Sequence, residues 1–531
     1  MIIKSKEFFL PVLGYSGLTL CLFFYMNHRI QPDMAWLMIA AKRLAAGGTM
    51  STDFYETNPP LSVLFYIIPA LTSEYLSFLP PYLSPLLFSV ILYFMSVASV
   101  AFLVRQMRLF ETGFRRYCVY CYAAALIIIP LLCFGQRDHV VAMALLPFML
   151  VQWSLTQRIV LNSWLKWPVL IIGSIVILLK PPCGLVPVLM LADRFYRQRR
   201  FSIVFDPDVL ALASALSLYL VAIFIFFPDF ISNILPDDLV LYIMIRLQSV
   251  AMLTGTLVFL SAGLGLLLWS MPADSTEPWA GVFILTALLC LVSYYVQGKG
   301  FYYHLVPFLI FSSMAMAFVF YQFAASFYGR GDWKTELFSF IAFVVCLFGL
   351  TRPPLTLLTH ADFQNSVLVK TIQNKCGPDC SFFMFNDALE IFAPVSLYAK
   401  REFGSRFSVY WFLPGILQEQ NSLTKNPDDK ELSANLKKHR EKYTQIVAED
   451  FKRYKPQLIL IGDCTIYNTA DHHCIVSFAE FFSTNREFRR QWSHYKREDI
   501  IKVPWKRYFD ASIKDGPEAE NYTFTVYRRK S

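Results

Sequence analysis

Charged residues are scarce in this chain of 531 residues: 16% are Asp, Glu, Lys or Arg, whereas 56% are apolar. Soluble globular chains carry about 25% charged residues, so the composition excludes an ordinary water-soluble protein. The charged residues are also unevenly distributed. Residues 1–360 hold 22 Lys or Arg and 17 Asp or Glu, whereas the shorter stretch 361–531 holds 26 Lys or Arg and 22 Asp or Glu. We therefore expect a membrane domain in residues 1–360 and a small soluble α/β domain in residues 361–531.

Other absences narrow the class of protein further. No small-residue cleavage site follows the apolar run at residues 8–26, so we expect an uncleaved first helix instead of a signal peptide. The basic residues behind the net charge of +9 lie mostly in short loops or are balanced by acids in the tail, which indicates membrane orientation and not nucleic-acid binding. No internal repeat is visible and no charge lies deep in an apolar run, which argues against a transporter with a midplane site.

Apolar runs of about 20 residues predict transmembrane helices. We expect about eleven, near residues 8–26, 84–104, 117–134, 139–156, 167–179, 184–196, 208–227, 248–269, 280–297, 304–324 and 337–358. The pair 167–179 and 184–196 is short and joined by Lys180 and two prolines, which favours broken helices that line a cavity. Residues 61–79 contain a proline and a glutamate, which favours an interfacial helix over a twelfth span.

The positions of Lys and Arg in the short loops set the orientation. With the N-terminus inside, the predicted cytoplasmic segments hold most of the basic residues of the membrane domain. An odd number of spans then places the tail outside. We predict a multi-pass protein of the bacterial inner membrane with a cytoplasmic N-terminus and a periplasmic C-terminal domain.

Unusual polar residues all fall on the predicted outer side. They are Asp33, Glu56, Gln136, Arg137, Asp138, Lys180, Gln297, Lys299, Tyr303 and His304. Ionisable residues at helix ends are costly against lipid and usually face a cavity. Carboxylates beside cations form a site that can hold a phosphate and activate a hydroxyl, and we expect these acids and cations to share one pocket.

Each of these residues also has a simpler structural explanation. Asp33 can be the N-cap of a helix over residues 34–46, and Asp138 can pair with Arg137 and cap a turn. Long basic side chains at span ends can extend to lipid headgroups, and a histidine there can be hydrogen-bonded at the interface. The first of these explanations applies to Lys180 and Lys299, and the second applies to His304. The functional interpretation rests on the coincidence of all the residues on one side.

The order of these motifs resembles the GT-C superfamily of glycosyltransferases, such as protein O-mannosyltransferases and lipid A aminoarabinose transferases. An acid early in the first outer loop, a short helix ending near Gly47 and Gly48, and an acid before Pro59-Pro60 look like the start of such enzymes. The sequences Gly-Gln-Arg-Asp-His at 135–139 and Gln-Gly-Lys-Gly-Phe-Tyr-Tyr-His at 297–304 also resemble motifs of bacterial members. The resemblance covers residues 1–360.

This resemblance implies an all-α polytopic membrane domain with interfacial helices and an inverting transfer from a polyprenyl-phosphate sugar. Asp33 matches the position of the catalytic carboxylate, and Glu56 matches the second acid. Aminoarabinose transferases have a Lys between that second acid and the prolines, whereas this chain has Thr57 and Asn58, so other cations must hold the donor phosphate. We expect phosphate binding by Arg137, Lys180, Lys299 and His304, supported by Asp138, Gln136, Gln297 and Tyr303.

The sequence therefore predicts a hexosyl- or pentosyltransferase that moves a sugar to an envelope glycan, lipid or protein acceptor, with Asp33 as general base. The alternatives are a transporter or flippase of a lipid-linked sugar and a non-catalytic envelope assembly protein. No cofactor is required; a divalent metal at Asp33 and Glu56 is compatible with two acids, but nothing in the sequence demands it. The expected partners are the lipid-linked donor, the acceptor and membrane lipids, and not nucleic acid.

The tail alternates short apolar runs with a longer helical pattern. Buried strands are expected at residues 381–385, 408–413 and 457–461, and an amphipathic helix at 429–454. This alternation predicts a small α/β domain.

An even number of cysteines in the tail predicts disulfides in an oxidising compartment. They are Cys376, Cys380, Cys464 and Cys474. Pairing between neighbours is the natural arrangement, and it is one of three connectivities that remain open. A zinc site that adds His472 or His473 is the alternative. A thioredoxin-like redox role is disfavoured, because three residues, not two, separate the first two cysteines.

Overall fold

The computed structural model describes residues 30–76, 78–107, 112–130, 133–242, 261, 263–264, 279–351, 363–386, 389–462, 477–504 and 521–530. The chain forms two compact units. We call them the helical unit, which takes the described residues within 86–222 and 246–353, and the mixed unit, which takes those within 28–85, 223–245 and 354–531. This division differs from the expected boundary near residue 360, because two earlier segments join the tail.

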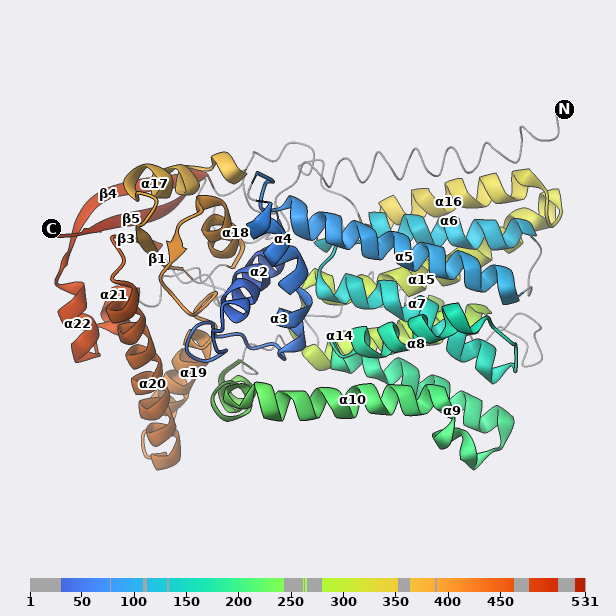
Figure 1. The fold of residues 1–531 in the computed structure, drawn as a ribbon, viewed down its shortest axis with the longest axis horizontal. Coiled ribbons are helices and arrows are strands. Elements are labelled where there is room, and N and C mark those ends of the chain that lie inside the picture. The colour runs from blue at the N-terminus through green and yellow to red at the C-terminus, as the bar shows by residue number, and fades with distance from the viewer. Residues whose placement is uncertain are drawn as a thin grey trace. The chain divides into compact units, whose positions relative to one another are not determined.

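Long apolar helices form the helical unit (Figure 1). They are α5 (Leu83–Met107), α6 (Thr112–Ile128), α7 (Arg137–Thr156), α8 (Ser163–Ile177), α9 (Leu185–Gln198), α10 (Pro207–Phe226), α14 (Trp279–Gln297), α15 (Tyr302–Tyr328) and α16 (Trp333–Thr351), with 3-10 turns η2 (Pro181–Gly184) and η3 (Phe201–Phe205). Helix α15 packs against α6, α7, α14 and α16, and α7 also contacts α8 and α9. Helices α7 and α15 are mostly buried, as expected of helices that are apolar on nearly all sides.

Five helices in the described part of the chain are long and apolar enough to cross a membrane, namely α5, α7, α10, α15 and α16. A helix of about 20 residues spans the roughly 30 Å of a bilayer core. This is a membrane protein by the length and composition of these helices. The predicted span at 8–26 and most of the predicted span at 248–269 lie outside the described residues. The count of about eleven spans therefore stays a prediction.

The segment around Lys180 breaks the path of the chain, as its prolines predict. Helix α8 is 15 residues long, about 22 Å, which is shorter than a bilayer core. Residues Pro181–Gly184 form a 3-10 turn, and α9 continues from Leu185. Proline has no N–H to donate and so interrupts the helix. Lys180 therefore lies at a break between two short helices.

Residues 61–79 form two short helices in the mixed unit and no span. Helix α3 (Leu61–Phe65) has five residues and α4 (Ile67–Tyr75) has nine, which gives α4 a length of about 14 Å. Such a helix is too short to cross a bilayer core. The described residues of this segment therefore form no helix long enough to span, and its place at the interface stays a prediction.

The first long helix of the mixed unit is α2 (Pro32–Ala45). Gln31 is its N-cap, and Pro32 occupies the first turn, where its fixed φ is favourable. The helix ends before Gly47, whose φ is +88°. A Cβ on Gly48 would lie 2.8 Å from the carbonyl oxygen of Arg43, so only glycine fits there. The predicted end of this helix near the two glycines is confirmed.

A five-stranded sheet forms the centre of the tail. Its strands are β1 (Ser381–Phe385), β2 (Glu402–Phe403), β3 (Leu458–Gly462), β4 (Tyr495–Pro504) and β5 (Asn521–Arg529), in the order β2-β1-β3-β5-β4. Strands β1, β2 and β3 are parallel, whereas β5 is antiparallel to β3 and β4. The strands expected at 381–385 and 457–461 are confirmed as β1 and β3.

The remaining elements of the mixed unit are helices and turns. They are η4 (Phe230–Ile234), α11 (Leu235–Asp237), η5 (Asp238–Tyr242), η7 (Phe363–Asn365), α17 (Val367–Lys375), α18 (Leu389–Ala399), α19 (Leu413–Lys425), α20 (Lys430–Tyr454), α21 (Phe478–Phe482) and α22 (Arg486–Trp492). Helix α20, which runs alongside α19 in Figure 1, confirms the amphipathic helix expected at 429–454, with Asp429 as its N-cap.

The strand expected at residues 408–413 is wrong. The segment is irregular and buried, and α19 begins at its end. Its aromatic side chains pack in several directions: Trp411 contacts Tyr55, and Phe412 stacks on Tyr443 with ring centroids 3.9 Å apart. A short apolar run signals burial but not the backbone geometry that achieves it.

Segments far apart in sequence meet inside the mixed unit. Helix α2 packs against α18. Arg43 donates hydrogen bonds to the backbone oxygens of Phe403 and Ser405 at 2.5 and 2.6 Å. The backbone N–H of Tyr55 donates to the carbonyl oxygen of Arg406 at 2.6 Å. The first loop and the tail thus share one core, which the sequence did not indicate.

A disulfide joins Cys376 and Cys380 at the end of α17, with Cα atoms 5.3 Å apart. The prediction of a local disulfide is confirmed for this pair. Cys464 and Cys474, together with His472 and His473, lie outside the described residues. Within the described part of the chain, no three His, Cys, Asp or Glu side chains gather where they could hold a metal ion.

Candidate functional site

Buried charged side chains meet at one end of the helical unit. We call Asp138, Lys180, Gln297, Tyr303 and His304 the ion-pair cluster. They come from the start of α7, the break after α8, the end of α14 and the start of α15. The chain reverses between neighbouring helices, so these termini belong to the same end of the bundle. The structure thus brings together five residues that the sequence placed in three separate loops.

The contacts within the ion-pair cluster centre on Lys180. Its Nζ lies 3.0 Å from Oδ2 of Asp138, and it donates to Oε1 of Gln297 at 3.1 Å. Nδ1 of His304 lies 3.3 Å from Oδ1 of Asp138 and 3.3 Å from Nζ of Lys180. Lys180 also lies over the ring of Tyr303, 5.7 Å from its centroid. Lys180 is therefore buried and paired, which is not the geometry of a side chain that extends to headgroups.

Local backbone structure fixes the loop that carries Asp138. Gln136 is the N-cap of α7, and its side-chain oxygen accepts from the N–H of Asp138 at 2.9 Å. Nδ1 of His139 accepts from the N–H of Gly135 at 2.9 Å, and Gly135 has a φ of +80°. Gln136 and His139 hold the turn, so the side chain of Asp138 is left for the cations. The explanation of Asp138 as a cap is wrong, because Gln136 is the cap.

The other two predicted cations flank the ion-pair cluster in sequence. Arg137 is the first residue of α7, and only 4% of its surface is exposed. Lys299 is half-buried in the loop between α14 and α15, two residues after Gln297. The glycines on both sides of Lys299 have φ of +66° and +71°, which allows a tight reversal there.

A buried ion pair is weak evidence of stabilisation, because the cost of removing two charges from water can exceed their attraction. Asp138 and Lys180 have side-chain exposures of only 2% and 8%. Ionisable groups at membrane depth are costly and indicate a functional site. The cluster is therefore the first candidate site in the helical unit.

The two predicted acids lie in the mixed unit, and Glu56 is held by neutral donors. Its Oε2 accepts from the indole N–H of Trp36 at 2.5 Å, and its Oε1 accepts from the backbone N–H of Asn58 at 2.7 Å. The side-chain amide of Asn58 also donates to Oε1. Both oxygens are thus engaged, and 4% of Glu56 is exposed. Asn58 thus serves to hold this acid.

Asp33 stands in the first turn of α2 and is half-buried. The side chain of Gln31, not of Asp33, caps this helix by accepting from the N–H of Met34 at 2.9 Å. The explanation of Asp33 as an N-cap is therefore wrong. Asp33 and Trp36 are one turn apart on α2, so this helix links Asp33 to the residue that binds Glu56. We call Asp33, Trp36, Glu56 and Asn58 the acid group.

The sequence missed several residues of these sites. Trp36 and Asn58 hold Glu56, yet only their closeness to the acids in sequence marks them. The acid group and the ion-pair cluster belong to different units, and their meeting in one pocket stays a prediction. A basic pocket inside the mixed unit, described below, was not expected at all.

No family model matches the sequence, and no curated protein matches it. Among solved structures, the chain is similar to ArnT from Cupriavidus metallidurans bound to undecaprenyl phosphate, with 13% identity, a TM-score of 0.48, and coverage of 97% of this chain and 98% of that one. It is also similar to the oligosaccharyltransferase AglB from Archaeoglobus fulgidus in complex with an inhibitory peptide and a dolichol-phosphate, with 12% identity, a TM-score of 0.43, and coverage of 96% and 75%. Both proteins belong to the GT-C superfamily, which the motifs resemble.

Proposed function

We propose that this protein is a membrane glycosyltransferase that moves a sugar from a polyprenyl-phosphate donor to a glycan, lipid or protein acceptor on the periplasmic side of the bacterial inner membrane. The observation that carries the proposal is the buried ion-pair cluster at one end of an apolar bundle. A lipid phosphate needs cations at the end of an apolar surface, and this cluster supplies them.

The charges of the cluster favour an anionic ligand. The three loops that carry the cluster hold three basic side chains, those of Arg137, Lys180 and Lys299, and one acid, Asp138. Asp138 contacts Lys180 and His304, and the bases of these loops outnumber the acid, which favours an anionic ligand such as a phosphate. Phosphate oxygens form strong charge-assisted hydrogen bonds with such groups. The same contacts strengthen as negative charge develops on the leaving phosphate.

The acid group supplies the proton acceptor. Asp33 stands half-buried in the first turn of α2, one turn from Trp36, which binds Glu56, and we assign it the role of general base. In the proposed step, Asp33 takes the proton of the acceptor hydroxyl or amine. The oxygen or nitrogen of that acceptor group attacks the anomeric carbon of the donor sugar. The bond from that carbon to the phosphate oxygen breaks, and its electron pair leaves with the lipid phosphate. The sugar is thereby transferred with inversion.

Glu56 then has a positioning role. It binds Trp36, which is one turn from Asp33 on the same helix. This contact fixes the first turn of α2 and so the place of the base. General bases work only within hydrogen-bond reach of the proton they remove, so a small displacement lowers the rate.

A proteoliposome assay tests the proposal with wild-type protein, Asp33→Asn and the exposed control Asp428→Asn. The donor probe is a polyprenyl-phosphate sugar fraction extracted from bacterial membranes, and the acceptor is an envelope extract. The readout is release of free polyprenyl phosphate. We expect release with wild type and Asp428→Asn, and loss of it with Asp33→Asn. Full release by a folded Asp33→Asn protein would exclude this base, and carrier translocation without release would indicate a flippase.

A further inference from the structure

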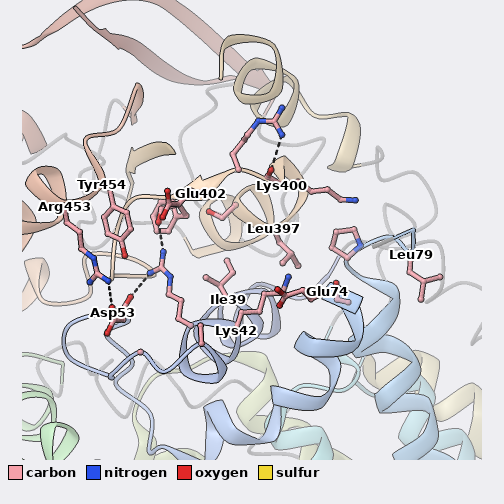
Figure 2. Close-up of a pocket in the computed structure, with 18 residues that line it drawn as sticks. Ile39, Lys42, Asp53, Glu74, Leu79, Leu397, Lys400, Glu402, Arg453 and Tyr454 are labelled. Atoms are coloured by element: carbon pink, nitrogen blue, oxygen red, sulfur yellow. Dashed lines mark hydrogen bonds and ion pairs between the residues drawn. The ribbon is translucent and has the colours of Figure 1, made fainter. Parts of the chain in front are cut away.

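A pocket of about 820 Å³ lies within the mixed unit, and neither the sequence nor the proposed mechanism accounts for it (Figure 2). Its walls come from α2, α4, the end of α18, β2 and the end of α20. The lining residues that carry charge are Lys42, Arg43, Asp53, Glu74, Lys400, Arg401, Glu402 and Arg453. Pockets of 300 to 1,000 Å³ are typical of small-molecule sites, so this one has room for a ligand.

The arginines of the pocket build its walls. Arg43 donates to three backbone oxygens, those of Asp53, Phe403 and Ser405, at 2.5 to 2.8 Å. Arg453 pairs with Asp53 at 2.5 Å. Figure 2 shows this pair beside Tyr454 at one end of the pocket. These contacts fix the shape of the pocket by joining the first loop to the tail.

The lysines give the pocket its excess of positive charge. Lys42 comes from α2 and Lys400 from the turn that ends α18, where its φ is +50°. Burial lowers the pKa of Lys42, the charge of Glu74 opposes this, and the like charge of Lys400 lowers it further. Two like charges that face one space repel each other, and an anion between them relieves the repulsion. The five cations of the pocket also outnumber its three carboxylates.

The rest of the lining suits a sugar. Aliphatic side chains cover part of the wall, and the rings of Phe403 and Tyr454 lie under Arg43, each with its centroid 5.9 Å from the guanidinium carbon. The aliphatic residues are Ile39, Leu79, Pro81 and Leu397. Sugar rings present C–H faces to such surfaces and hydroxyls to polar ones. A wall of this kind beside two lysines fits a sugar that carries an acidic group.

We propose that this pocket binds an anionic sugar, bearing a phosphate or a carboxylate, between Lys42 and Lys400. The inference rests on the proposed function in one respect, which is that this sugar is part of the acceptor. Lys42 is nine residues from Asp33 on α2, about 14 Å along the helix axis. The pocket therefore holds a part of the acceptor remote from the reacting group. Remote contacts of this kind position a substrate for reaction.

Binding of small anionic sugars to the full-length protein in detergent tests the proposal. The probes are glucose 1-phosphate, glucuronate and neutral glucose, measured by calorimetry at low ionic strength. We expect wild type to bind at least one charged probe and not glucose. Lys42→Gln combined with Lys400→Gln should weaken that binding at least about tenfold, since each charge-assisted hydrogen bond contributes strongly. Lys430→Gln, a matched exposed lysine outside the pocket, should bind like wild type.

Each outcome decides a separate point. Equal binding of glucose and the charged probes, or unchanged binding by the double variant, would overturn the proposal. The probe that binds more tightly distinguishes phosphate from carboxylate. Lys42→Arg combined with Lys400→Arg should retain binding, which separates loss of charge from loss of fold. Asp33→Asn should bind the probe normally, so a failure of sugar transfer and a failure of this pocket are distinguishable.

Discussion

The two candidate sites hold their carboxylates in opposite ways. Asp138 in the helical unit is bound by a lysine and a histidine. Glu56 in the mixed unit is bound by the N–H groups of Trp36 and Asn58, which are neutral. Oppositely charged side chains thus surround the first acid, whereas hydrogen bonds from uncharged groups hold the second. The comparison teaches that a buried acid can be held either by cations or by neutral N–H groups.

The largest expected effect is on the transfer rate. Asp33→Asn should lower it about 10²- to 10⁴-fold, because general base catalysis typically contributes this much. Its thermal unfolding temperature should remain close to that of wild type, because Asp33 is half-buried and is not the helix cap. Release of polyprenyl phosphate and a melting curve measure the two quantities. A melting temperature that falls with the rate would assign Asp33 to the fold instead.

Changes in the ion-pair cluster should lower the free energy of unfolding. Asp138→Asn leaves the Lys180 ammonium buried without its carboxylate, which should cost about 3–5 kcal/mol of unfolding free energy. The double change Asp138→Leu with Lys180→Met should regain most of that stability but remain inactive. Chemical denaturation in detergent measures the difference. If the double variant is active, the cluster is a structural pair and does not bind phosphate.

The acid group should show a smaller effect. Trp36→Phe removes one hydrogen bond to the Glu56 carboxylate and keeps an aromatic ring, at a cost of about 1.5–3 kcal/mol. We expect a lower transfer rate at saturating acceptor, because the first turn of α2 loses its anchor. Full kinetics of the variant separate this effect from weaker binding. An unchanged rate would mean that Glu56 does not position Asp33.

The smallest expected effect on stability comes from a change in the exposed ion pair between Asp53 and Arg453. This pair contrasts with the buried pair of Asp138 and Lys180. Burial alone would raise the pKa of Asp53, but hydrogen bonds from Thr49, Arg453 and Thr52 outweigh it and lower that pKa. An acid with a lowered pKa stabilises the fold above its unfolded value near 3.8, and this contribution is lost as the pH falls through the lower folded value. Asp53→Asn should therefore cost about 0.2–1 kcal/mol at neutral pH and nothing in strong acid. Melting curves from pH 7 to pH 2 measure it; an equal loss at every pH would point to packing instead of charge.

Much of the helical unit could be predicted from hydropathy, because an apolar run of about 20 residues has few alternatives in a membrane. The prolines after Lys180 also predicted the break in the chain, since proline cannot continue a helix. The proximity of Asp138, Lys180 and His304 could be predicted from the expected topology, which places their loops on the same side of the membrane. Their partner Gln297 was named for the same reason.

Other features depended on contacts that no local pattern encodes. The apolar run at 408–413 packs the rings of Trp411 and Phe412 against Tyr55 and Tyr443, so its backbone stays irregular. The short spacing between Cys376 and Cys380 predicted their disulfide, because two cysteines this close in sequence can pair without a contact to a distant part of the chain. The union of residues 28–85 with the tail, by contrast, arises from hydrogen bonds between residues about 360 positions apart.

That union sets an order of events for synthesis of the chain. Helix α2 emerges early, but the surfaces that cover it, α18 and the strand that receives Arg43, emerge more than 300 residues later. Contacts across such long separations form late and slowly. The packing around α2 can therefore be completed only after the chain has been made as far as Ser405, so a product truncated before α18 would keep its early helices but leave α2 uncovered.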